Sequence, residues 1–191
     1  MRGFWLALGL ATWVSAADAA SYEITVGEPN RIEFESKAPT ETFSGKTNRA
    51  SGSVTLNPAA LADPIEVRVE VEMASFKTGS GIRDRHMREE HLHTDRFPAA
   101  VFTAASLTGL SSPTLAPGQE VTAVAHGEME LHGVKKPLDA PVVLSMQEGA
   151  LHVVARFPIT LADYGIPRPQ FLIMKLGETQ KVTVDVLARA K

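Results

Sequence analysis

The stretch EVTAVAHGEMEL, which runs from Glu120 to Leu131, decides the fold class of this chain because its residues alternate in character. From Val121 onward, every second residue is apolar or glycine, while His126, Glu128 and Glu130 occupy intervening positions. A period of two is typical of a β-strand that buries one face and exposes the other to water. Half-polar strands of this kind favour antiparallel pairing over a buried parallel sheet.

Eight further segments have strand-like patterns and are separated by turn residues such as Asn57-Pro58 and Asp63-Pro64. We expect strands at residues 22–26, 31–36, 51–56, 65–73, 99–107, 136–146, 151–159 and 181–188. The longest irregular stretch, Gly109 to Gln119, predicts a loop within one domain, and no internal repeat or linker is present. The chain is therefore predicted to be all-β, either a sandwich or a closed barrel.

One charged segment, RDRHMREEHL at residues 83–92, predicts a helix among these strands. Ser80 or Asp84 is a suitable helix start, and Pro98 follows the helix. We expect the helix, over Ile82 to Leu92, to border the mouth of a tunnel, with Met87 turned toward the apolar interior. Residues 82, 87 and 92 are five apart, and on an α-helix they do not form a single stripe. The helix is thus predicted to dock only in part.

The predicted inner faces of the strands mix small and large residues. The small ones are Ala100, Ala104, Ala123, Ala125, Gly127, Ala140 and Ala155. The large ones include Phe34, Phe102, Met129 and Phe157. Small inward residues either leave room for one ligand or merely fit the taper of a filled barrel, and the pattern leaves both interpretations open.

The N-terminus has the features of a secretory signal peptide over residues 1–19. Arg2 precedes an apolar run from Phe4 to Val14, and Ala17-Asp18-Ala19 fits a small-x-small cleavage rule. The apolar run is shorter than the roughly 20 residues that a membrane-spanning helix needs. We therefore expect a periplasmic or secreted protein without stable membrane insertion, whose residues 20–191 form one β-barrel domain.

Composition narrows the class of partner. The net charge of -3 is small, which argues against nucleic acid. The chain has no cysteine, so a core of apolar side chains has to stabilise it without disulfides.

The six histidines raise the question of a metal site, and their spacing argues against one. His86 and His91 are five residues apart, which places them on different sides of an α-helix. His93 is close to both in sequence, and His132 stands in a hairpin that the fold could bring near. We interpret these histidines as surface or supporting residues and expect no metal and no other cofactor.

Catalytic patterns are missing from the sequence. There is no G-x-S-x-G motif, P-loop or C-x-x-C pair. Glu89 and Glu90 are neighbours that diverge by roughly 100° on a helix, so they are typical of a solvated face. We expect no catalytic residues and no enzymatic activity. His132-Gly133 predicts a tight turn in which glycine takes a positive φ, with His132 either steadying the barrel end or meeting a ligand head group.

Three motifs together resemble the YceI-like family of exported lipid-binding barrels. The first is Arg83-Asp84-Arg85-His86-Met87 with Phe97-Pro98-Ala99-Ala100-Val101-Phe102, similar to an RDxHL helix and a YPxxxF strand. The second is Gly127 to Pro137, similar to a GxLxxHGVxKP hairpin, and the third is Asp163-Tyr164-Gly165-Ile166, similar to DFGI. Their order matches from about Tyr22 to the C-terminus. The chain departs from the family at Leu92-His93, where many members have two aromatic residues.

The resemblance implies an extended, eight-stranded, antiparallel lipocalin-like barrel with a short helix near one end. It also implies an apolar tunnel that holds a long-chain amphiphile of the isoprenoid or fatty-acyl type as ligand. The residues expected to contact the ligand are Phe34, Val69, Phe76, Met87, Phe102, Met129, Leu131 and Phe157. Two alternatives stay open: a stress-related structural or interaction barrel without ligand, and a histidine-rich metal-binding variant. The sequence also leaves a homodimer open.

Overall fold

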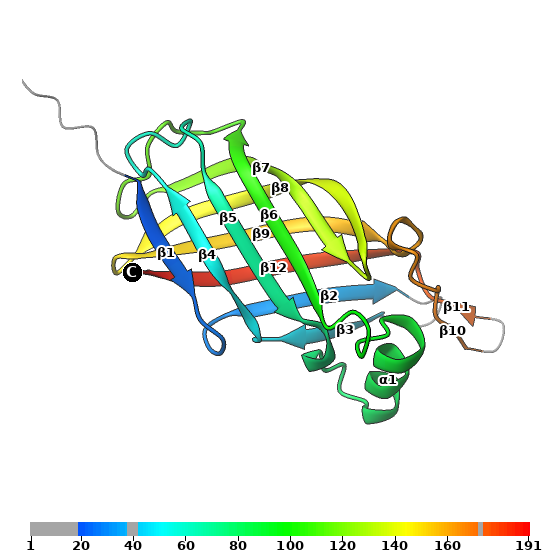
Figure 1. Ribbon diagram of the computed structural model, residues 1–191. Helices are drawn as coiled ribbons and strands as arrows, with labels where there is room; N and C mark the ends of the chain where they lie inside the picture. Colours follow the sequence, from blue (N-terminus) through cyan, green and yellow to red (C-terminus); the bar gives the residue numbers. More distant parts are fainter. Residues whose placement is uncertain (1–18, 38–41, 172–173) are drawn as a thin grey trace, which may run out of the picture.

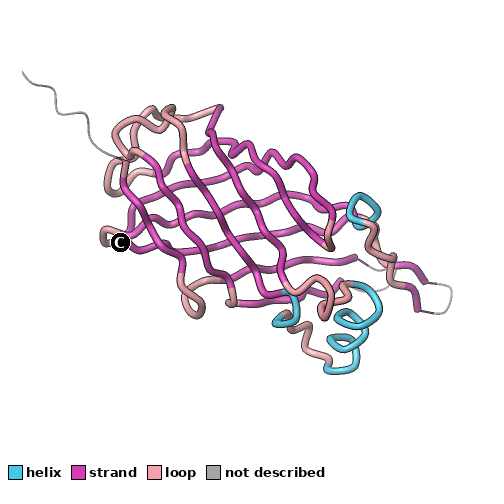
Figure 2. Tube along the Cα trace, in the orientation of Figure 1, coloured by secondary structure: helices cyan, strands magenta, loops and turns pink. Residues whose placement is uncertain are grey.

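The structure, a computed structural model, describes residues 19–37, 42–171 and 174–191, and these form a β-barrel with helical turns gathered at one end (Figures 1 and 2). The strands are β1 Ala20–Ile24, β2 Arg31–Lys37, β3 Thr42–Thr47, β4 Ala50–Leu56, β5 Glu66–Glu72, β6 Ala99–Thr108, β7 Glu120–Leu131, β8 Val134–Gln147, β9 Ala150–Thr160, β10 Gln170–Phe171, β11 Met174–Lys175 and β12 Thr179–Ala190. The helical elements are η1 Met73–Ser75, α1 Gly81–His86, η2 Met87–His91 and η3 Leu161–Tyr164.

The barrel closes through antiparallel pairing around a ring of eight strands. The pairing order is β1-β4-β5-β6-β7-β8-β9-β12, and β12 pairs back with β1. This confirms the predicted fold class, an eight-stranded antiparallel barrel with a short helix near one end. Of the residues whose placement is described, no helix is long and apolar enough to cross a membrane. The predicted signal peptide lies outside the described residues except for Ala19.

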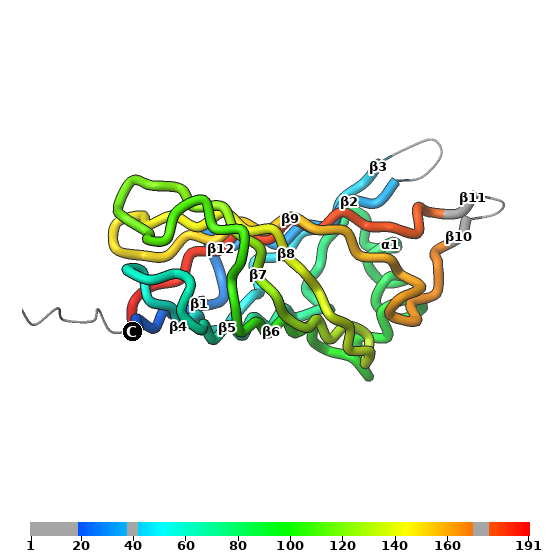
Figure 3. The backbone as a smooth tube through the Cα atoms, turned by 90° about the horizontal axis from the view of Figure 1, so that it is seen from above, coloured from blue at the N-terminus to red at the C-terminus, as the bar shows by residue number. Residues whose placement is uncertain are grey.

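Strand β12 divides one edge between two partners. Near its C-terminal end it pairs with β1 at Tyr22↔Ala190, and nearer its N-terminal end it pairs with β2 from Lys181↔Glu35 to Asp185↔Arg31. The hairpin of β2 and β3 therefore extends the wall at the helix end, away from both described termini (Figure 3). The sequence patterns did not predict β3, because Phe43 is the one large apolar residue in Thr42–Thr47.

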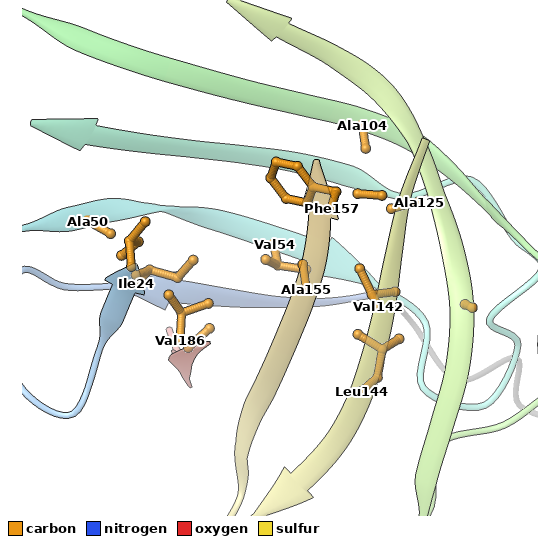
Figure 4. Close-up of a cluster of buried hydrophobic side chains, with 14 of the residues drawn as sticks. Ile24, Ala50, Val54, Ala104, Ala125, Val142, Leu144, Ala155, Phe157 and Val186 are labelled. Atoms are coloured by element: carbon orange, nitrogen blue, oxygen red, sulfur yellow. The ribbon is translucent and has the colours of Figure 1, made fainter. Parts of the chain in front are cut away.

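Two loops with buried leucine side chains close the end of the barrel opposite the helix. The two loops meet there, because the backbone N–H of Leu61 donates to the Pro113 carbonyl and that of Leu115 donates to the Pro58 carbonyl. Leu61 and Leu115 are both buried, together with inward side chains of the strands. The buried core of the barrel includes many small residues: Ala50, Ala104, Ala123, Ala125, Ala140, Ala155 and Ala188. Figure 4 labels Ala50, Ala104, Ala125 and Ala155 among the buried side chains.

The helix starts after Ser80, one of the two predicted residues, and its second half has a geometry that the sequence did not predict. Ser80 is its N-cap and accepts a hydrogen bond from the backbone N–H of Arg83. From Met87 the helix widens into a π turn, in which the N–H of Leu92 donates to the carbonyl of Met87 five residues earlier. A π turn holds more residues than an α turn, so positions five apart stay on one face. The expectation of divergence is therefore wrong for Met87 and Leu92, whereas Ile82 stands in the α-helical part before the π turn and is 67% exposed.

The turn between β7 and β8 has the predicted form. His132 and Gly133 both have positive φ, 53° and 74°. Two positive φ values in a two-residue loop suit the right-handed twist of a β-hairpin. This turn places His132 at the helix end of the barrel, close to Phe97.

We predict that Gly127→Ala destabilises the barrel by about 1–3 kcal/mol, the usual cost of overpacking a filled interior. A Cβ atom at Gly127 would lie 2.0 Å from the Thr103 carbonyl oxygen and 2.9 Å from Cζ of Phe102. Chemical denaturation measures the loss. Gly81→Ala is the matched control, because a Cβ there meets no heavy atom within 4 Å. Equal stability of the two variants would contradict this view of the packing.

Candidate functional site

The helix end of the barrel contains a cavity of about 590 Å³. Its wall combines strands of the barrel with the helix and with the segment that follows β9. Most of the lining residues are apolar: Ile32, Phe34, Phe43, Val71, Met73, Phe76, Ile82, Met87, Leu92, Ala100, Met129, Leu131, Phe157, Ile159, Leu161, Ile166, Pro169, Leu176, Val182 and Val184. A space of this size and character suits a largely apolar ligand.

Six of the eight residues that the sequence assigned to ligand contact lie in the cavity wall. They are Phe34, Phe76, Met87, Met129, Leu131 and Phe157. Val69 and Phe102 do not line the cavity. They form a cross-strand pair that packs against the core, and the ring of Phe102 reaches over Gly127. These two side chains thus lie between the cavity and the packed end. The ligand contacts themselves stay predictions.

The cavity does not arise from the small inward residues, so of the two interpretations that the sequence left open, the one in which they leave room for a ligand does not hold. Of the seven small residues named there, only Ala100 lines the cavity. Ala104, Ala123, Ala125 and others of the set are buried in the packed half. The wall of the space instead contains large side chains of the β2–β3 hairpin and of the helix, among them Phe34, Phe43 and Met87. The sequence does not indicate where the cavity lies, because neither β3 nor the π turn produces a recognisable periodic pattern of residues.

The helix forms one side of the cavity and is fixed to the barrel through its polar residues. Asp84, 5% exposed, accepts hydrogen bonds at Oδ1 from the Thr78 N–H and O–H, at 2.8 and 2.6 Å. Burial acts to raise the pKa of Asp84, but the two bonds from Thr78 and the nearby Lys77 and Arg88 lower it overall. Arg83 donates from Nε to the Thr78 hydroxyl and from Nη2 to the Thr78 carbonyl, and it stacks on Phe43. Asp84 thus ties the helix to the chain before it.

Seven polar or charged residues interrupt the apolar wall: Glu33, Ser36, Ser80, Arg83, His86, His91 and Gln180. Burial acts to raise the pKa of Glu33, while hydrogen bonds from Arg31 and Ser44 and the charges of Arg31 and Lys46 lower it overall. Gln180 donates through Nε2 to the Gly177 carbonyl. Sequence reasoning missed Ser36 and Gln180, although the alternation of β2 around Phe34 could have placed Ser36 on the inner face.

The surroundings of His91, one of the polar residues of the wall, lower the pKa of its ring. Burial lowers the pKa of His91, and His86 and His93 lower it further, while Glu90 and a hydrogen bond to the Pro167 carbonyl raise it. His86 and His91 both line the cavity, so the expectation that they lie on different sides of the helix is wrong. The π turn is the physical reason for this difference.

His93 and His132 form a pair that joins the end of the helix to the β7–β8 turn. His132 Nδ1 lies 3.1 Å from the Tyr164 carbonyl oxygen, and His132 Nε2 lies 2.9 Å from His93 Nδ1. A carbonyl only accepts, so His132 Nδ1 carries a proton, and in neutral His132 Nε2 accepts the proton of His93 Nδ1–H. Phe97 packs against the ring of His132. This supports the interpretation that His132 steadies the barrel end.

A second polar constellation lies on the outside of the barrel. Thr108 Oγ1 is 2.6 Å from His126 Nε2, and His126 Nδ1 is 2.7 Å from Asp139 Oδ1. The residue types and order resemble a hydroxyl nucleophile, base and orienting acid. However, the three sit side by side on paired strands, where ladder hydrogen bonds engage the backbone and an oxyanion hole has no place to form. We interpret the group as a cross-strand network that joins β6, β7 and β8.

Comparison with known proteins identifies relatives. The family model described as "YceI-like domain" matches residues 22–188, which confirms the resemblance found in the motifs. No curated protein matches the chain. Two solved structures are similar, both with a TM-score of 0.68. A polyisoprenoid binding domain from Saccharophagus degradans implicated in plant cell wall breakdown is 17% identical, over 91% of this chain and 100% of that one. BcnA from Burkholderia cenocepacia is 15% identical, over 83% of this chain and 95% of that one.

A third solved structure, the YceI protein of Campylobacter jejuni, is 14% identical with a TM-score of 0.60, over 77% of this chain and 84% of that one. At such identities these similarities establish the fold.

We predict that metal removal leaves stability unchanged. Within residues 19–37, 42–171 and 174–191, no three His, Cys, Asp or Glu side chains are grouped to hold a metal ion. Thermal unfolding with and without a chelator should therefore coincide. A large fall in melting temperature on chelation, reversed by zinc, would support the metal-binding alternative instead.

We predict that His91 contributes to loss of stability in acid. Its pKa is lowered by folding, so the folded chain resists protonation more than the unfolded chain. The associated stability is complete above the unfolded pKa of about 6.5 and is lost as the pH falls through the lower folded value. The melting temperature of His91→Phe should thus fall less than that of the parent between pH 7.5 and pH 5. Parallel pH curves would contradict the assignment.

Proposed function

The chain belongs to the family of YceI-like domains, and we propose that it binds a long-chain amphiphile of the isoprenoid or fatty-acyl type. The observation that carries the proposal is the cavity of about 590 Å³ with its largely apolar wall at the helix end of the barrel. The proposed role is binding, with the lipid as ligand and without a cofactor or catalysis.

The physics of such binding is transfer of an apolar tail out of water. Each fully buried methylene contributes about 0.8 kcal/mol, so ten contribute about 8 kcal/mol. Association costs about 4–15 kcal/mol in lost freedom of motion, so a short tail would bind weakly and a longer one firmly. The depth of the cavity then sets the preferred tail length.

Two kinds of observation support an isoprenoid or fatty-acyl ligand over the alternatives. The similar domain from Saccharophagus degradans is described as polyisoprenoid binding, and its fold is shared over nearly all of this chain. The cavity itself argues against a filled barrel that serves only as a structural module.

We also propose that the protein is exported to the periplasm or secreted, on the strength of the signal-peptide pattern in residues 1–19. Cleavage after Ala19 would leave Ala20 at the start of β1, so the barrel would lose no strand. The sequence leaves a homodimer open.

We predict that Ala100→Phe lowers the uptake of a fluorescent long-chain lipid at least about tenfold while the barrel stays folded. Ala100 is the small residue that lines the cavity, and a benzyl group there would occupy space that the tail needs. A titration followed by fluorescence measures uptake, and thermal unfolding reports the fold.

Thr103→Phe is the matched control for this variant. Thr103 lies on the same strand but is exposed on the outer face, so the control should bind lipid like the parent. If both variants bound lipid as the parent does, the cavity would not be the binding site.

A further inference from the structure

Phe102 stands on the inner face of β6, between the cavity and the buried core. Inward positions on a strand are two residues apart, and on β6 they are Ala100, Phe102 and Ala104. Ala100 lines the cavity, whereas Ala104 is buried in the core. Phe102 also pairs across the sheet with Met129, which belongs to the cavity wall. On this side of the barrel the cavity therefore ends at Phe102.

The ring of Phe102 leans away from the helix end and lies over Gly127. A Cβ atom at Gly127 would be 2.9 Å from Cζ of Phe102. Gly127 precedes Met129 on β7, so it is further from the helix end, where β7 turns into β8. Ala104 faces Gly127 across β6 and β7. These two residues have almost no side chain, and the ring of Phe102 occupies the space that they leave.

The neighbours of Phe102 at this depth are smaller. Val69 pairs with Phe102 on β5, and Leu138 pairs with Gly127 on β8. Both are aliphatic, both pack against the core, and neither lines the cavity. Among β5, β6, β7 and β8, the largest side chain at the inner end of the cavity is therefore that of Phe102.

A side chain in this position limits the length of a bound tail. Each methylene that a tail buries raises its affinity about fourfold, until the end of the tail meets a barrier. Further methylenes then stay in water or fold back, so they add no affinity. The residue at the inner end of the cavity thus decides the chain length at which affinity stops rising.

We propose that Phe102 is a specificity-determining residue, whose ring blocks the inner end of the cavity and limits the length of the tail that the barrel accepts. This inference rests on the proposed function, because it takes the occupant of the cavity to be an apolar tail. The limiting chain length should follow the size of the side chain at position 102.

The experiment measures the affinity of saturated long-chain alcohols, in a series that grows by two carbons at a step, by competition with a fluorescent lipid. For the parent protein, affinity should rise with each step and then level off. Phe102→Ala should move this limit to longer chains, because Ala104 and Gly127 cannot refill the space of the ring. The first alcohol beyond the parent's limit should bind about tenfold more tightly to the variant than to the parent.

Leu107→Ala is the matched control. Leu107 is a buried residue of the same strand, deeper in the barrel and outside the cavity wall. This control also removes buried apolar volume, but it should leave the limit unchanged. Ala104→Leu, added to Phe102→Ala, should shift the limit back, because leucine refills the opened space. If Phe102→Ala does not fold, Phe102→Leu is the milder variant, and its limit should move in the same direction by less.

Three results would overturn the inference. An unchanged limit in a folded Phe102 variant, with binding intact, would mean that the tail ends elsewhere, while the proposed function would stand. An equal shift in Leu107→Ala would assign the effect to general loosening of the core. Failure of the parent protein to bind any alcohol of the series would count against the proposed function as well.

Discussion

The structure depends on the way in which β12 shares one edge between two strands. Its pairing with β1 closes the eight-stranded ring, and its pairing with β2 carries the wall further at the helix end. The division gives one end that is packed by loops and alanines and another that contains the cavity. The difference between a filled barrel and a hollow one is thus decided by strand pairing.

The helix completes the hollow end because it is anchored at both of its ends by polar contacts and turns apolar residues inward. Asp84 and Thr78 fix its start, and the His93–His132 pair fixes the segment after it to the barrel. Between these anchors the π turn brings Met87, His91 and Leu92 to the cavity. Ile82 lines the cavity as well, although it is 67% exposed. Ile82 therefore borders both the cavity and solvent.

Sequence alone was sufficient for features that rest on local periodicity. The alternation of Glu120–Leu131, the N-cap at Ser80 and the turn at His132-Gly133 follow from the conformational preferences of single residues, and all three are present in the structure. The family was recognisable because its motifs coincide with these same elements. Six of the eight expected contact residues line the cavity, and four of them, Phe34, Met129, Leu131 and Phe157, are inward-facing strand positions that follow from the alternation.

The location of the cavity and its polar residues could not be predicted in the same way, because both depend on contacts between distant segments. β3 lacks alternation, and its place is set by pairing with β2. The π turn contains a backbone hydrogen bond from Leu92 to the carbonyl of Met87. No residue pattern in the sequence predicts this bond. For this reason His86 and His91 were expected on different sides of the helix. Ala125, one of the small residues that could have left room for a ligand, packs in the core.

Native mass spectrometry of the protein purified from its own host tests the central claim most directly, because it weighs the barrel together with whatever fills the cavity. We expect a mass above that of the polypeptide, and we expect extraction with organic solvent to remove the excess and release a long-chain amphiphile. The polypeptide mass alone, combined with no uptake when isoprenoids, fatty acids or long-chain alcohols are added, would contradict the account.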